Sequence, residues 1–257
     1  MIKNVNGLNI NYIIKGEGKP VVLLHGWGSN ISLFSSMTEL ISKKYKVIAM
    51  DLPGFGKSDE PKEAWTVDNY VDFVIDFLKE FGFEEAIFLG HSFGGRIIIK
   101  LFSRKNLPFK ITDIILTGSA GVLPKKSTKQ KVKVKIYKIT KNIYSSKLIK
   151  KFFPNALENL RNKNGSADYK AASPVMRQTL VKVVNEDLVP LFENINIPTL
   201  LIWGKNDTAT PLEDGKLMNS KMKGSALVVL ENSGHYAFLD EMFAFNKILA
   251  SYLKIEV

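Results

Sequence analysis

The sequence predicts an α/β fold built around a mainly parallel, buried β-sheet, and two observations lead to this prediction. Short, continuous apolar runs recur along the chain, each bounded by Gly, Pro or Asn. Between them lie segments whose apolar residues are spaced three and four positions apart. The runs are typical of strands buried on both faces, and the spacing is typical of amphipathic helices. Their alternation indicates helices on both faces of the sheet, with ligands bound at the carboxyl ends of the strands.

The elements follow in chain order from these two patterns. The weakly alternating segment 9–14 comes after Asn6-Gly7, a dipeptide typical of tight β-hairpin turns. Helical spacing of apolar residues predicts helices within 70–81, 97–102 and 243–253. The continuous apolar runs predict six buried strands, at residues 21–24, 47–50, 86–89, 111–116, 199–203 and 227–230.

The alternation of strands and helices stops between Gly121 and about Pro190. We therefore expect a core formed by residues 1–120 and 190–257, with residues 121–189 inserted as a helical cap. Within the cap, 175–184 has a helical pattern, and Pro174 before it suits the first turn of a helix. Residues 131–143 alternate at first and then continue at helical spacing, which favours a helix there as well.

Length and composition fit a soluble globular protein. The chain has 257 residues, of which 45% are hydrophobic and 24% charged, and this length can bury a large core. It contains no cysteine, which excludes disulfides, thiolate catalysis and cysteine-based zinc sites. We find no signal-peptide pattern and no apolar stretch of membrane-spanning length, so we expect a cytoplasmic protein.

The net charge of +11 is concentrated in one segment. Eleven lysines and no acidic residue lie between Lys125 and Lys151, and the rest of the chain is balanced. Because no basic–aromatic surface motif accompanies these lysines, we expect no nucleic-acid partner. The run has two interpretations: a solvated face of the cap, which we favour, or a surface that attracts anionic substrates or an anionic membrane.

The motif Gly90-His91-Ser92-Phe93-Gly94-Gly95 directly follows one predicted strand and precedes a predicted helix. This G-x-S-x-G pattern in this context is typical of a nucleophile elbow, a sharp turn that requires small residues on either side of the serine. The helix that begins there offers unpaired N–H groups at its positive end. The sequence therefore predicts Ser92 as a catalytic nucleophile and the Phe93 N–H as an oxyanion donor.

A serine needs a base, and the base needs a carboxylate to orient it. Of the three histidines, His235 lies on a loop just after the last predicted strand, whereas His91 should point away from the pocket. Asp207 lies on the loop after the preceding strand, which gives the order Ser…Asp…His expected for this fold. Asp51 is a competing acid, but it precedes the serine in sequence, and we expect it to anchor the Pro53-Gly54 turn.

A second oxyanion donor is predicted on an early loop. His25-Gly26-Trp27-Gly28 follows the strand at 21–24, and its glycines allow backbone N–H groups to face a ligand. We expect the Trp27 N–H to be that donor and the His25 ring to be structural. No dinucleotide-binding pattern and no cluster of metal ligands is present, so we expect no cofactor and no metal.

With these motifs, together with Asp51-Leu52-Pro53-Gly54-Phe55-Gly56 and Trp203-Gly204-Lys205-Asn206-Asp207, the chain resembles the α/β-hydrolase superfamily over about 1–120 and 190–257. The resemblance implies a mostly parallel eight-stranded sheet flanked by helices, a lid after strand six, and no cofactor. It also implies catalytic roles for Ser92, Asp207 and His235, and oxyanion roles for Trp27 and Phe93. Relatives that use an aspartate nucleophile are a poor match because Ser92 stands at that position.

The predicted function is a serine hydrolase that acts on small carboxylic esters or related carbonyl compounds through an acyl-enzyme. Two alternatives stay open. One is C–C bond hydrolysis or a lyase reaction with the same triad, and the other is a small-ligand receptor that retains the fold. The natural substrate depends on the packing of the cap, which the sequence does not define.

Overall fold

The computed structural model describes residues 1–123 and 166–256, together with isolated positions in between: 136, 139, 140, 142–144, 146, 152, 153, 155, 156 and 160. Among the described residues, no helix is both long enough and apolar enough to span a membrane. The predicted helix at 131–143 and the lysine run from 125 to 151 lie largely outside these residues.

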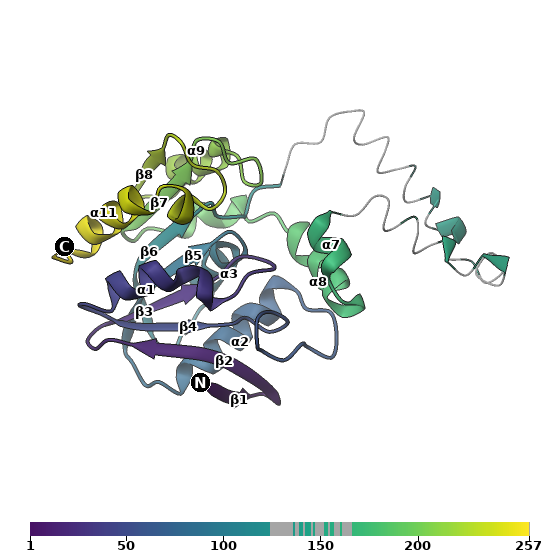
Figure 1. Ribbon diagram of the computed structural model, residues 1–257, viewed down its shortest axis with the longest axis horizontal. Helices are drawn as coiled ribbons and strands as arrows, with labels where there is room; N and C mark the ends of the chain where they lie inside the picture. Colours follow the sequence, from purple (N-terminus) through teal and green to yellow (C-terminus); the bar gives the residue numbers. More distant parts are fainter. Residues whose placement is uncertain are drawn as a thin grey trace.

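One sheet of eight strands organises the molecule, in the order β1-β2-β4-β3-β5-β6-β7-β8 (Figure 1). β1 and β2 are antiparallel, and β2 also pairs antiparallel with β4, whereas β4, β3, β5, β6, β7 and β8 run parallel. The strands are β1 (Ile2–Val5), β2 (Leu8–Lys15), β3 (Pro20–Leu24), β4 (Lys46–Met50), β5 (Glu85–His91), β6 (Lys110–Thr117), β7 (Thr199–Gly204) and β8 (Ser225–Leu230).

All six predicted buried strands are present, and the hairpin prediction at Asn6-Gly7 is also confirmed. Asn6 and Gly7 both have positive φ, 52° and 79°, as a type I′ turn requires. β3 is central: its two neighbours are β4, which follows it in sequence, and β5, which lies on its other side. The chain therefore reverses its direction of winding at β3, and α/β sheets bind ligands at such a point.

Helices cover both faces of the sheet, and alternate strand residues pack into two separate clusters. On β3, Val22 and Leu24 belong to one cluster, whereas Val21 and Leu23 belong to the other. The first cluster lies under α2 (Val67–Lys79), α3 (Phe93–Phe102) and α9 (Leu212–Lys221). The second lies under α1 (Ser35–Ile41), α10 (Ala237–Asp240) and α11 (Met242–Leu253). Two short 3-10 helices, η1 (Ile31–Phe34) and η2 (Val189–Asn194), complete these layers.

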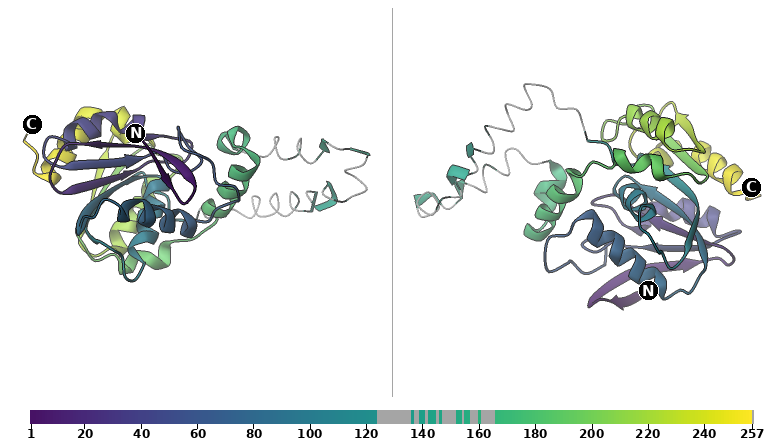
Figure 2. Two further views of the ribbon diagram at one scale, coloured as in Figure 1. Left: turned by 90° about the horizontal axis from the view of Figure 1, so that it is seen from below. Right: turned by 180° about the vertical axis from the view of Figure 1, so that it is seen from behind.

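The segment predicted as a cap contains α7 (Ala167–Ala171) and α8 (Pro174–Val184), and its described residues include no strand. Helix α8 begins at Pro174 as predicted, and the Ser173 hydroxyl caps it by accepting the N–H of Met176 at 3.2 Å. Figures 1 and 2 show α7 and α8 beside the carboxyl ends of the strands. They therefore lie on the side of the sheet where a substrate is expected.

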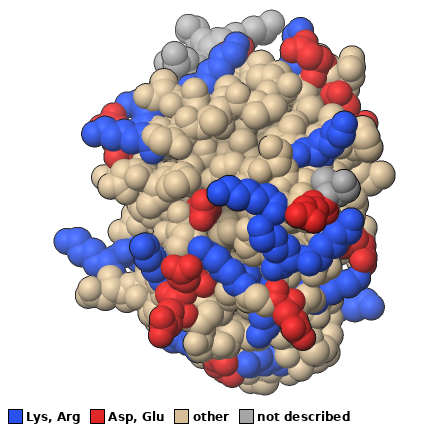
Figure 3. Space-filling view, turned by 90° about the vertical axis from the view of Figure 1, so that its left-hand side faces the viewer, with Lys and Arg blue, Asp and Glu red and all other residues tan. Residues whose placement is uncertain are grey.

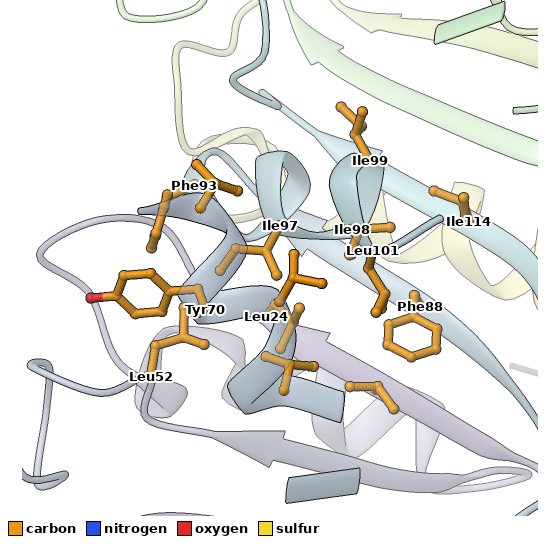
Figure 4. Packing of buried hydrophobic residues seen from close by; sticks show 14 of the residues in the cluster. Leu24, Leu52, Tyr70, Phe88, Phe93, Ile97, Ile98, Ile99, Leu101 and Ile114 are labelled. Atoms are coloured by element: carbon orange, nitrogen blue, oxygen red, sulfur yellow. The ribbon is translucent and has the colours of Figure 1, made fainter. Parts of the chain in front are cut away.

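Below this edge, the first cluster supports the turn that carries Ser92. Figure 4 shows Tyr70 pointing toward Phe93, and the two rings pack edge to face with centroids 5.0 Å apart. Tyr70 is fully buried, and its hydroxyl donates to the carbonyl of Pro53 at 2.9 Å. This contact fixes the start of α3 against the loop after β4, so the nucleophile turn rests on a packed core.

Candidate active site

Ser92 occupies a strained turn between β5 and α3. Its backbone has φ 50° and ψ −109°, a region that costs a non-glycine residue free energy and persists only where neighbours impose it. Two hydrogen bonds hold the turn: the Ser92 N–H donates to Thr117 O at 3.2 Å, and the Ala120 N–H donates to Ser92 O at 3.0 Å. The local conformation is the one that the G-x-S-x-G pattern predicts.

The flanking glycines are required because other backbone passes very close to them. A Cβ atom at position 94 would lie 1.9 Å from the carbonyl oxygen of Leu24, at the end of β3. A Cβ atom at position 90 would lie 2.6 Å from the Gly95 nitrogen. Any side chain at either position would therefore push the turn away from β3 or from its own helix.

Asp207 and His235 lie in direct contact on the loops after β7 and β8. Asp207 Oδ2 is 2.9 Å from His235 Nδ1, and the carboxylate is buried while the imidazole is 18% exposed. Asp207 Oδ1 accepts the N–H groups of Ala209 and Thr210, each at 2.9 Å. Burial alone would raise the pKa of the Asp207 carboxyl, but the bonds from His235 and Thr210 lower it overall. The carboxylate is therefore ionised and fixed in place.

Thr210 is a member of this cluster that the sequence analysis did not identify. Its hydroxyl lies 2.8 Å from Asp207 Oδ2, 2.9 Å from Gly118 O and 3.2 Å from His235 Nδ1. The signal was local: an aspartate followed three residues later by threonine is typical of a turn in which the aspartate accepts nearby N–H groups. Thr210 joins the Asp207 loop to the end of β6.

His91 is buried, as predicted for a residue that points away from the pocket, but it contacts the His235 loop. Its Nε2–H donates to the carbonyl of His235 at 3.0 Å, and the two rings are 4.7 Å apart. Burial, followed by the nearby His235 ring, lowers the pKa of His91 to about 3. His91 is therefore neutral, and it links the chain at Ser92 to the histidine loop.

The structure places Ser92 beside this pair without joining the hydroxyl to it. Among the described residues, the Ser92 hydroxyl has no hydrogen bond to the His235 ring, and its neighbour His91 makes the contact instead. Unliganded active sites often have long or absent catalytic hydrogen bonds that tighten when substrate binds.

The two predicted oxyanion donors flank Ser92. Phe93 begins α3, where the first N–H groups of a helix have no partner within the helix. The loop carrying Trp27 passes against the serine, since a Cβ atom at Gly26 would lie 3.2 Å from Ser92 Cβ. Among the described residues, no backbone oxygen accepts the N–H of Trp27 or Phe93. Neither N–H group is therefore engaged by a described backbone acceptor.

His25 and Asp51, which competed for catalytic roles, are both engaged elsewhere. His25 donates from Nδ1 to Gly26 O at 2.7 Å and accepts the Leu52 N–H at Nε2, at 2.9 Å. Burial lowers the pKa of His25 to about 4, so the ring is neutral. Asp51 accepts N–H groups from Ile31 at 2.8 Å and Lys57 at 2.9 Å, which anchors the loop after β4 as predicted.

Comparison with known proteins decides the family. The model of the α/β-hydrolase fold family matches residues 19–138, and the model of a family described as TAP-like protein matches residues 171–255. An AB hydrolase superfamily protein of Bacillus subtilis, YisY, is 30% identical over 247 residues, which cover 92% of each chain. The chain belongs to the α/β-hydrolase superfamily. It is a hydrolase with the eight-stranded, mostly parallel sheet of that fold, flanked by helices.

Two further relatives of this α/β-hydrolase are named for their activities. An esterase from Exiguobacterium antarcticum is 27% identical, with a TM-score of 0.74 and 98% of each chain covered. A 2-hydroxy-6-oxo-6-(2'-aminophenyl)hexa-2,4-dienoic acid hydrolase from Metapseudomonas resinovorans is 24% identical over 273 residues, covering 97% of this chain and 89% of the relative. Relatives named as an esterase and as a dienoic acid hydrolase are thus similar to this α/β-hydrolase at 27% and 24% identity.

A cavity of about 500 Å³ lies beside the Trp27 loop of the hydrolase, between the loop after β4 and the helices α7 and α8. Its walls include the aromatic residues Trp27 and Phe55 and the side chain of Met176. Volumes of roughly 300–1,000 Å³ are typical of small-molecule sites. Within the described part of the chain, no group of three or more His, Asp or Glu residues could hold a metal ion.

Proposed function

We propose that this hydrolase cleaves small carboxylic esters, with Ser92 as nucleophile, His235 as general base and Asp207 as the acid that orients it. One observation carries the proposal: the buried, ionised carboxylate of Asp207 lies 2.9 Å from His235 Nδ1. The loop that carries His235 is hydrogen-bonded to His91, the residue next to Ser92 in its strained turn. That constellation of nucleophile, base and orienting acid is typical of acyl transfer.

In the acylation step, the Ser92 oxygen attacks the ester carbonyl carbon while His235 Nε2 takes the hydroxyl proton. The charge that develops on the carbonyl oxygen is stabilised by the N–H groups of Trp27 and Phe93, which have no competing acceptor in the described backbone. The imidazolium then gives its proton to the departing alcohol, and an ester of Ser92 remains.

In the deacylation step, water replaces the alcohol. His235 removes a proton from the water as it attacks the acyl carbon, and then returns it to the Ser92 oxygen as the acid departs. Asp207 stabilises the imidazolium in both steps without becoming protonated, in keeping with its lowered pKa. Each turnover consumes one water and releases one alcohol and one acid.

We also propose that residues 1–120 and 190–257 form the hydrolase core and that 121–189 form a helical cap. The helices α7 and α8, and the absence of strands from the described residues of this segment, support the division. Met176 on α8 supports contact with the core, since a Cβ atom at Gly54 would lie 2.5 Å from its sulfur.

C–C bond hydrolysis is the second candidate, because a relative named as a hydrolase of a 2-hydroxy-6-oxo dienoic acid matches 97% of this chain. It requires the same triad, so the triad does not discriminate between the two. The two activities can be separated by comparing turnover of p-nitrophenyl esters with turnover of a 2-hydroxy-6-oxo-hexa-2,4-dienoic acid. A protein that binds esters tightly without turnover would instead be a receptor.

The central test replaces Ser92 by Ala and measures hydrolysis of short p-nitrophenyl esters. We expect loss of several orders of magnitude in kcat, an equal loss in His235→Ala, and little change in thermal unfolding. Ser103→Ala is the matched control, since Ser103 lies at the other end of α3. A phosphonate ester should label Ser92 in the wild type and not in His235→Ala. Near-wild-type activity in Ser92→Ala would contradict the proposal.

A further inference from the structure

The cavity beside the Trp27 loop combines apolar walls with a polar mouth. Trp27 and Phe55 pack edge to face, with ring centroids 4.8 Å apart, and both line the cavity. Met176 closes the same space from α8. These three side chains offer an apolar surface to a hydrocarbon chain, and the cavity adjoins the residue that we propose as an oxyanion donor.

Two carboxylates, both on exposed residues, stand at the mouth of this cavity. Asp168 on α7 faces the Trp27 loop, since a Cβ atom at Gly28 would lie 3.7 Å from its Oδ1. Glu60 lies on the loop after β4, and its Oε1 accepts the hydroxyl of Ser173 at 2.6 Å. Among the described residues, no lysine or arginine lines the cavity. The described part of the mouth therefore carries two negative charges, although the whole chain carries +11.

The negative charge of Asp168 also reaches the histidine loop. Burial, and then the charge of Asp168, raise the pKa of Tyr236, the residue after His235. Asp168 thus lies beside the loop of one proposed oxyanion donor, and its charge acts on the loop of the proposed base.

An orphaned hydroxyl provides an independent sign of a ligand. Ser29 lines the cavity and is only 6% exposed, and its Oγ has no hydrogen-bond partner among the described residues. A buried hydroxyl without a partner costs free energy, so such groups call for an explanation. A ligand with an N–H or O–H donor would satisfy it.

From these contacts we infer that the cavity binds a primary ammonium group at the end of a short apolar chain, and that the hydrolase prefers esters carrying one. The inference rests on the proposed esterase function. An ammonium has three N–H donors. Asp168, Glu60 and Ser29 supply three acceptors, and Trp27 and Phe55 add aromatic faces that attract a cation. A carboxylate or phosphate at this position would face two like charges.

The face that lies away from α7 and α8 does not produce the same preference. On this face, shown in Figure 3, Lys and Arg side chains are interspersed with Asp and Glu. A mixed surface has no strong field of one sign, and salt screens it within about 10 Å. We therefore expect this face to contribute little to discrimination between substrates of opposite charge.

The test compares p-nitrophenyl 6-aminohexanoate with p-nitrophenyl heptanoate, in which a methyl replaces the ammonium. Acetates of 6-aminohexanol and heptanol form a second pair, with the ammonium on the alcohol side. We expect kcat/KM to favour the ammonium ester on the order of fivefold in one pair, as for exposed ion pairs assisted by an aromatic face. The preference should shrink as salt increases.

Asp168→Asn should bring this ratio close to one, and Glu60→Gln should lower it in part. The matched control is Glu17→Gln, which removes the same charge from the exposed turn between β2 and β3 and should keep the wild-type ratio. Equal kcat/KM for both members of both pairs in the wild type would overturn the inference. The esterase proposal would survive that result if Ser92→Ala were inactive.

If no ester is hydrolysed, the proposed function fails and binding of hexylammonium to Ser92→Ala decides the inference. Trp27 lines the cavity, so its fluorescence reports occupancy. We expect Asp168→Asn to weaken hexylammonium binding on the order of fivefold and Glu17→Gln to leave it unchanged. Equal binding by all variants, or no difference between hexylammonium and hexanol, would refute the ammonium site.

Discussion

The loops after β4 and β7 each carry a buried aspartate, yet the two carboxylates have different partners. Asp51 accepts from the Ile31 and Lys57 N–H groups and from the side-chain amide of Asn11, so all its described partners belong to the scaffold. Asp207 also accepts backbone N–H groups at Oδ1, but its Oδ2 contacts the side chains of His235 and Thr210. A buried aspartate therefore anchors a loop in either case, and the second is the one that we propose orients a base.

The largest expected difference between the two aspartates is in catalysis, and Asp207→Asn tests it. An amide presents the wrong group to His235 Nδ1 and cannot stabilise the imidazolium, so kcat on a neutral ester should fall by about 10³–10⁴. Steady-state kinetics on p-nitrophenyl acetate measures this loss. A variant that kept the wild-type kcat would remove Asp207 from the mechanism.

Contacts of the loop after β4 should instead affect how the free energy of unfolding depends on pH. His25 accepts the Leu52 N–H of that loop, and its folded pKa of about 4 lies below the ordinary 6.5. Between pH 6.5 and 4 the unfolded chain binds a proton that the folded chain excludes, so stability falls as pH falls. The loss amounts to about 3 kcal/mol for His25.

Urea unfolding at pH 7 and pH 4 measures this loss. His25→Gln should reduce it by about half, because the pKa of His91 is lowered in the same direction and its contribution remains. An identical pH dependence in wild type and His25→Gln would show that His25 does not contribute.

Asp51→Asn should destabilise the fold by about 2 kcal/mol, because all described partners of this carboxylate are donors and an amide must turn one N–H group toward them. Its kcat should stay within about threefold of the wild type. Urea unfolding and ester kinetics on the same preparation separate the two effects. A large loss of kcat with unchanged stability would make Asp51, rather than Asp207, the catalytic acid.

The smallest expected effect belongs to Thr210→Val. The threonine hydroxyl contacts both Asp207 and His235, so its removal should loosen the pair and lower kcat about fivefold, equivalent to one hydrogen bond of about 1 kcal/mol. The variant should unfold at nearly the wild-type temperature. An unchanged kcat would mean that the Asp207 N–H contacts alone position the carboxylate.

The buried strands could be predicted because parallel sheets demand continuous apolar runs, and all six predicted runs are strands. Helix α9 was not predicted because its apolar signal is weak: its only buried residues are Gly215 and Met218. Gly215 is needed since a Cβ atom there would lie 2.8 Å from the Trp203 ring. A helix that buries only one glycine and one methionine shows no periodic pattern of apolar residues in the sequence.

The site was predictable where a motif reflects backbone geometry. The glycines around Ser92 and the loops carrying Asp207 and His235 follow from the elbow pattern and from strand order. The contacts of Thr210 with Gly118 and His235, and the position of Asp168 beside Gly28, could not be predicted. They depend on how loops distant in sequence meet in space, and a single sequence carries no record of such contacts.

The bond from His91 to the carbonyl of His235 has a consequence for motion. Ser92, the proposed nucleophile, and His91, which is hydrogen-bonded to the loop of the proposed base, are adjacent residues of one turn. The positions of the two reactive groups therefore depend on the same turn. A displacement of β5 carries both along, so the gap between them varies less than the position of either. We therefore expect changes in the neighbouring helices α7 and α8 to alter substrate preference without changing the distance between these two groups.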